Sequence, residues 1–171
     1  MPTNSYMFFV SALIPMFIGF LYYSDALFGK TWRQLNGFTK EDLEKGNALA
    51  IMGGAYILCV LLSVMVSSLV IHQGHTLQMM LPSGATELPE DLKVVFMDLM
   101  AKHGENHRSF QHGVIHGAIS GVFLAIPLIG VNALFERRGW KYIMIHSFYW
   151  IITLGLMGGL LCATLKYAPL T

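Results

Sequence analysis

Four continuous apolar stretches constrain the fold of this chain more than any other feature. They cover residues 6–28, 47–72, 112–135 and 140–168, and each reaches the roughly 20 residues that a helix needs to cross a bilayer. Because apolar residues run on without alternating at every second position, they predict helices rather than barrel strands. Only 12% of the residues are charged, about half the share usual in soluble domains. The sequence therefore predicts an all-α integral membrane four-helix bundle, a single domain over residues 1–171.

Lysine and arginine are distributed unequally over the connections between these stretches. The first and third connections hold seven: Lys30, Arg33, Lys40, Lys45, Arg137, Arg138 and Lys141. The second connection and the C-terminal end hold four: Lys93, Lys102, Arg108 and Lys166. Since positive residues favour the cytoplasmic side, we expect both termini and the connection over residues 73–111 to be extracytoplasmic. Without a basic block, nothing in the charge pattern points to nucleic acid.

The 73–111 connection contains an amphipathic segment. Between Pro89 and Lys102 the apolar residues recur at helical spacing: Leu92, Val95, Phe96, Leu99 and Met100. Pro89 suits the first turn of a helix and Gly104 suits its end. We expect a helix with one apolar stripe, and its mixed polar face favours packing against protein over lying on the membrane surface.

Histidines gather in and beside the same connection. Six of the seven lie there: His72, His75, His103, His107, His112 and His116. Two pairs, 103/107 and 112/116, have the i, i+4 spacing that places two imidazoles on one helical face and suits a divalent metal such as zinc. On one unbroken helix, however, the two pairs would face opposite sides because nine residues turn about 900°. A shared site therefore needs either a break at Gly104 or a union of the 112/116 pair with His72 and His75.

The same stretch also supports a purely structural interpretation. Gly113, Gly117 and Gly121 repeat every four residues and leave one helix face without side chains. In the last stretch the adjacent Gly158 and Gly159 also lack side chains. Such faces allow close approach of a second membrane helix. On this interpretation the neighbouring histidines only form hydrogen bonds at the interface, and the sequence favours it over a metal or ligand site.

A second polar group lies near the opposite end of the predicted spans. It comprises Ser24, Asp25, Asn132, His146 and Tyr149. Ionisable residues inside spans are candidate functional sites, and an Asp25–His146 pair is geometrically possible. The alternative is that Asp25 reaches the headgroups or pairs with Lys30, and the sequence leaves the two open.

Two motifs resemble a known family. The first runs from Tyr23 to Trp32 (YSDALFGKTW) and the second from Asn132 to Glu136 (NALFE). Together they resemble a bacterial domain-of-unknown-function family of small four-span membrane proteins. The resemblance implies a bacterial inner-membrane location and brings no activity, substrate or cofactor. Against the family pattern, this chain has Asp25 in place of proline, His146 in place of asparagine and Trp150 in place of histidine, which weakens the case for family-wide Asp–His chemistry.

The sequence thus favours a non-enzymatic membrane protein that acts as a homo-oligomer or as an accessory subunit of a larger complex, in contact with lipid. The alternative is a metal-binding or redox-linked protein with an outward-facing histidine site, in which a divalent metal is the cofactor. A small-solute transporter ranks third, since no charged or broken-helix site lies at the midplane. No nucleophile motif or phosphate loop supports an enzyme.

Overall fold

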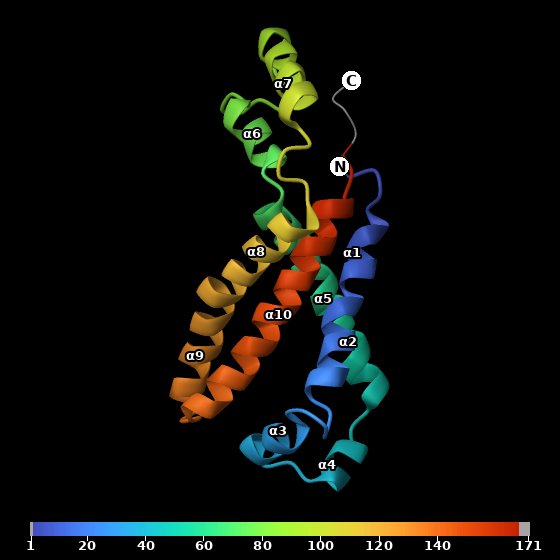
Figure 1. Ribbon diagram of the computed structural model, residues 1–171, viewed down its shortest axis with the longest axis vertical. Coiled ribbons are helices and arrows are strands. Elements are labelled where there is room, and N and C mark those ends of the chain that lie inside the picture. Colours follow the sequence, from blue (N-terminus) through green and yellow to red (C-terminus); the bar gives the residue numbers. More distant parts are fainter. Residues whose placement is uncertain (1, 168–171) are drawn as a thin grey trace.

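The computed structural model describes residues 2–167, and its regular structure there is helical apart from one bridge between Pro2 and Tyr167 (Figure 1). In chain order the helices are α1 (Tyr6–Ser11), α2 (Leu13–Tyr22), α3 (Gly29–Asn36), α4 (Lys40–Glu44), α5 (Ala48–Val70), α6 (Gln73–Met80), α7 (Glu90–His103), α8 (Phe110–Ser120), the π-helical turn η1 (Gly121–Ala125), α9 (Ile126–Phe135) and α10 (Trp140–Thr164). The all-α prediction is confirmed.

Three helical segments are long and apolar enough to cross a membrane: α5, the continuous Phe110–Phe135 segment formed by α8, η1 and α9, and α10. Large apolar side chains cover the outside of the molecule, with Phe135 88% and Leu49 85% exposed. In water such a surface would be strongly unfavourable, whereas in lipid it has no cost. The architecture is that of a helical membrane protein.

The first predicted span is shorter in the structure than in the sequence analysis. Its apolar helix covers Tyr6–Tyr22, 17 residues or about 25 Å, and not residues 6–28. The chain turns after Tyr22 because the Ser24 carbonyl accepts hydrogen bonds from the amides of Leu27 and Gly29. The other predicted bounds shift by a few residues at their ends, and residue 168 lies outside the described range.

The same helix is interrupted at Ala12, which separates α1 from α2. Pro15, three residues further on, cannot donate a backbone hydrogen bond to the preceding turn. The Pro15 carbonyl accepts a hydrogen bond from the Tyr149 hydroxyl at 2.9 Å. This bond joins α2 to α10 in the buried part of the molecule.

α10 is the central helix, and it contacts α8, α5, α2, α9 and α1. The core forms where it meets α5, from Val66 and Val70 on one side and Leu154, Met157 and Leu161 on the other. Apolar packing around one helix therefore holds the spans together.

α8 approaches α10 through the glycine ridge, which comprises Gly113, Gly117 and Gly121. A β-carbon added at Gly113 or Gly117 would overlap the carbonyl oxygen of Gly158 or Leu154, respectively. Gly158 and Gly159 on α10 are packed equally closely against α8. The glycines that the sequence predicted to allow close approach of a second membrane helix thus form the α8–α10 contact within one chain.

The molecule has two distinct ends (Figure 1). The histidine end carries α6, α7, Pro2 and Tyr167; the turn end carries α3, α4 and the connection between α9 and α10. At the histidine end α6 and α7 project beyond the bundle, and Phe96 is the buried member of the α7 stripe while Val95 is 56% exposed. The expectation that this stripe packs against protein is met only in part.

Candidate metal centre and the polar groups of the turn end

His72 enters the candidate site because α5 ends two residues before it. Ile71 is extended, with φ −117° and ψ 109°, and turns the chain out of the helix. His72 then precedes α6, and its carbonyl accepts a hydrogen bond from the amide of His75 at 3.0 Å. The imidazole is therefore held at a helix junction.

His112 and His116 are placed by the start of α8. The extended Ser109 caps this helix, and its hydroxyl accepts a hydrogen bond from the amide of His112 at 3.2 Å. One turn later His116 lies beside His112, with their ring centroids 4.3 Å apart. Because the glycine ridge packs against α10, the two rings lie on the flank of α8.

Three imidazoles meet at this point. His72, His112 and His116 each offer a ring nitrogen, and these three nitrogens all lie within 4.8 Å of one another. The Nε2 atoms of His72 and His112 are 3.2 Å apart. With metal–nitrogen bonds of about 2.05 Å, the edge of a tetrahedral site measures roughly 3.3 Å. The group has the composition of a three-histidine metal centre, and the His72–His112 distance already matches that edge.

Buried hydrogen bonds fix the two segments that carry these rings. The Cys162 thiol on α10 has the carbonyl oxygens of Val70 and His107 within reach, at 3.4 and 3.3 Å. The Gln73 side-chain amide donates to the carbonyl of Gly104 at 2.7 Å. The end of α5 and the connection before α8 are thus tied to each other and to α10, which preorganises the histidines.

The remaining histidines of this end have different positions. α7 ends at His103, and His107 follows in a turn with φ 62°, so these two do not share a helical face as their spacing predicted. The predicted break near Gly104 explains this. His107 and His75 flank the three-histidine group, with ring centroids 5.1 Å from His112 and 6.4 Å from His72, whereas His103 contacts Asn106.

The environment keeps the group in the form that binds metal. Nearby protein atoms that displace water lower the pKa of His72, and the rings of His116, His75 and His107 lower it further. A lowered pKa favours the neutral imidazole, whose nitrogen lone pair is the ligand. Repulsion between neighbouring imidazolium ions thus favours the neutral imidazole, which is also the form that a metal ion binds.

At the turn end, the Asp25–His146 pair that the sequence allowed is not formed. Asp25 instead contacts Arg33 at 2.6 Å and Lys40 at 3.2 Å, and these cations lower its pKa. The predicted alternative, Lys30, is not its partner either. The turn after α2 directs Asp25 toward α3, and Ser24 contributes its carbonyl to the same turn.

His146 and Asn132 line a common cavity of about 280 Å³ between α9 and α10. The Tyr23 hydroxyl lies 2.9 Å from Nδ1 of His146, while Nε2 is shielded from solvent and has no hydrogen-bond partner. Tyr142 and Trp150 also line the cavity. Neither residue was predicted as part of a site, although residues 142, 146 and 150 recur at the i, i+4 spacing of one helical face.

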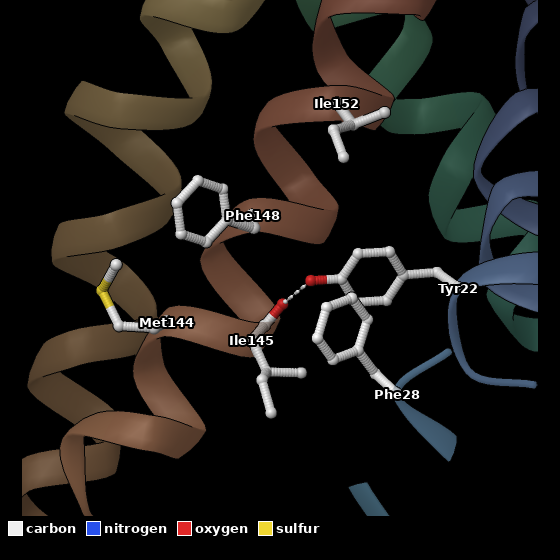
Figure 2. Close-up of a pocket in the computed structure, with 6 residues that line it drawn as sticks. All are labelled: Tyr22, Phe28, Met144, Ile145, Phe148 and Ile152. Carbon is white, nitrogen blue, oxygen red and sulfur yellow. Dashed lines mark hydrogen bonds between the residues drawn. The ribbon is translucent and has the colours of Figure 1, made fainter. Parts of the chain in front are cut away.

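A second, apolar cavity of about 460 Å³ lies on another side of α10 (Figure 2). Tyr22 and Phe28 lie on one side of it and Phe148 and Met144 on the other. The Tyr22 hydroxyl is already engaged, because it donates to the Ile145 carbonyl at 2.9 Å. With no free polar group among these side chains, this cavity suits hydrocarbon only.

These features define a small helical membrane protein with a cluster of histidines at one end. The chain belongs to a family described as protein of unknown function (DUF1761), whose model matches residues 6–162. The family resemblance inferred from the two motifs is thereby confirmed. No curated protein and no solved structure matches the chain.

Proposed function

We propose that this protein binds a divalent transition-metal ion at the membrane surface through His72, His112 and His116. The observation that carries the proposal is the convergence of three ring nitrogens within 4.8 Å from two separate segments of the chain. Simple helical spacing explains the nearness of His112 to His116, but it does not explain His72, which is 40 residues away.

The ligand type restricts the metal ions that this site can bind. Imidazole suits zinc, copper, nickel and iron, whereas magnesium and calcium prefer oxygen ligands. The group contains no carboxylate and no thiolate, so the site keeps the full positive charge of the ion. We therefore expect zinc or copper rather than an alkaline-earth ion.

Three protein ligands leave a tetrahedral ion with one open position. Structural zinc sites use four protein ligands, while sites that exchange or activate a bound molecule use three. His72 is an exposed residue, so the open position is accessible from the surrounding medium. On the topology expected from lysine and arginine, that medium is extracytoplasmic. These properties favour an ion that exchanges or binds a further molecule at the surface over an ion with a purely structural role.

Cobalt titration of the purified protein in detergent tests the proposal, because tetrahedral Co²⁺ is coloured and replaces zinc in imidazole sites. We expect one equivalent of Co²⁺ to bind with the intense visible absorption of a four-coordinate ion, and one equivalent of Zn²⁺ to displace it. Binding of His103→Ala should equal that of the native protein, since this ring lies outside the group. Absence of a saturable equivalent would leave the 3.2 Å contact as a hydrogen bond between two neutral imidazoles and end the proposal.

The homo-oligomer or accessory-subunit role stays a prediction from the sequence. The glycine-lined faces of α8 and α10, which could have served a contact between subunits, pack against each other within one chain. Gly53 and Gly54 on α5 have open space around them and are the glycines still available to a neighbouring helix. The transporter role has gained no support.

A further inference from the structure

The cavity between α9 and α10 lies near one end of both helices, close to the boundary between the hydrocarbon core and the lipid headgroups. α10 has 25 residues and is about 37 Å long, against about 30 Å for a hydrocarbon core, so about one turn of it extends beyond the core. His146 is six residues from the start of α10, and Asn132 is one turn from the end of α9. The side chains that line the cavity therefore face the boundary between hydrocarbon and headgroups.

One buried polar atom of this cavity, Nε2 of His146, is not used by the fold. Tyr22 and Tyr149 nearby donate to backbone carbonyls, but Nε2 of His146 has no partner. If the Tyr23 hydroxyl donates to Nδ1, the neutral imidazole carries its proton on Nε2. Asn132 and Tyr142 bring an amide and a hydroxyl that can donate as well. A buried donor without a partner costs free energy, which a ligand with acceptor oxygens recovers.

The charge beside the cavity is positive. Arg138 is anchored there: its guanidinium lies 5.3 Å from the Tyr142 ring centroid and donates to the Leu35 carbonyl at 2.7 Å. Glu136, the carboxylate that lines the cavity, is 3.5 Å from the same guanidinium. Arg137 and Lys141 add two exposed cations close by in the chain. This balance favours an anion over a cation.

We propose that this cavity binds the phosphate group of a phospholipid, with Asn132, Tyr142 and His146 donating hydrogen bonds and Arg138 providing the counter-charge. A lipid is favoured over free phosphate because Leu128, an apolar side chain of α9 that is 68% exposed, lies one turn from Asn132 in the direction of the hydrocarbon core. Acyl chains would lie against that surface while the phosphate enters between the helices.

Lipid titrations of the delipidated full-length protein, followed by native mass spectrometry, test this proposal. We expect phosphatidylglycerol to bind with one saturable equivalent, and diacylglycerol with the same acyl chains to bind at least about 10-fold more weakly because it lacks the phosphate. Equal binding of the two lipids would overturn the proposal. Full displacement by millimolar inorganic phosphate would also overturn it, in favour of a free-anion site.

Two variants and one matched control locate the site. Arg138→Gln and the milder Tyr142→Phe should each weaken phosphatidylglycerol binding, Arg138→Gln by about 10-fold because a charge-assisted bond is lost. Arg138 contacts two residues that line the cavity, Tyr142 and Glu136. Lys30→Gln removes a cation of the same end that is not a partner in either contact, and it should change nothing. Tyr142→Phe keeps the ring and its packing. If this variant binds phosphatidylglycerol as the native protein does while Lys30→Gln binds it more weakly, the site lies elsewhere.

Discussion

Gly117→Ala is expected to lower the free energy of unfolding by about 3 kcal/mol, through overpacking of the α8–α10 contact. The added methyl group would overlap the Leu154 carbonyl oxygen, and that backbone atom cannot move without displacing a turn of α10. Thermal unfolding in detergent, followed by circular dichroism, measures the loss. Because His116 precedes Gly117 in the chain, the shift should also weaken metal binding.

Gly53→Ala is the matched control for this substitution. It makes the same chemical change in a membrane helix, but nothing lies within 4 Å of the position that its methyl group would take. We expect unchanged or slightly higher stability, because alanine is favoured over glycine in helices by about 1 kcal/mol. If the two variants unfold at the same temperature, α8 and α10 do not pack as described.

Removing one imidazole of the candidate centre is expected to weaken metal binding by at least about 100-fold. The loss of a residue that only hydrogen-bonds to a metal ligand lowers metal affinity by about 10- to 100-fold, and the loss of a ligand itself should cost more. His72→Ala, His112→Ala and His116→Ala should each show this loss of affinity in the cobalt titration. The double variant His112→Ala/His116→Ala should retain no saturable equivalent. An affinity unchanged in His72→Ala would mean that helix α8 alone holds the ion.

Acid should release the ion in the same experiments. Each ligand must be neutral to bind, and the ordinary pKa of histidine is about 6.5, so affinity should fall by about 10- to 100-fold between pH 7.5 and 5.5. The pKa of His72 is lowered by desolvation and by the neighbouring imidazoles, so protonating this ligand requires a more acidic solution than protonating an ordinary histidine does. Binding that is constant over this range would indicate ligands other than imidazole.

Much of the fold could be predicted from apolar length and glycine spacing. Both patterns are local: a run of about 20 apolar residues specifies a span, and glycine at every fourth residue specifies one bare helical face. The end of the first helix at Tyr22 could not be predicted in this way, because apolar residues continue to Phe28 while the hydrogen bonds of Ser24 turn the backbone. The π-helical turn η1 likewise has no signal in hydropathy.

The candidate sites depend on contacts between distant segments, which a sequence specifies less directly. Helical phase showed that the two histidine pairs could not form one site on an unbroken helix. It left open a break at Gly104 or a union of the 112/116 pair with His72 and His75. The choice between His72 and the other candidates needed the extended Ile71 and the bonds of Cys162. At the turn end, the sequence placed Asp25 and His146 at similar depths in the membrane. In the structure Asp25 pairs with Arg33, because the turn after α2 directs it away from α10. His146 pairs with Tyr23 instead.

X-ray absorption at the zinc edge of the zinc-loaded protein reports directly on the three-histidine centre. We predict a first shell of nitrogen and oxygen ligands at about 2.0–2.1 Å, with outer-shell scattering from three imidazoles. In His72→Ala the outer-shell scattering should fall to that of two. A spectrum with no imidazole scattering, or one that His72→Ala leaves unchanged, would contradict a metal centre built from the end of α5 and the start of α8.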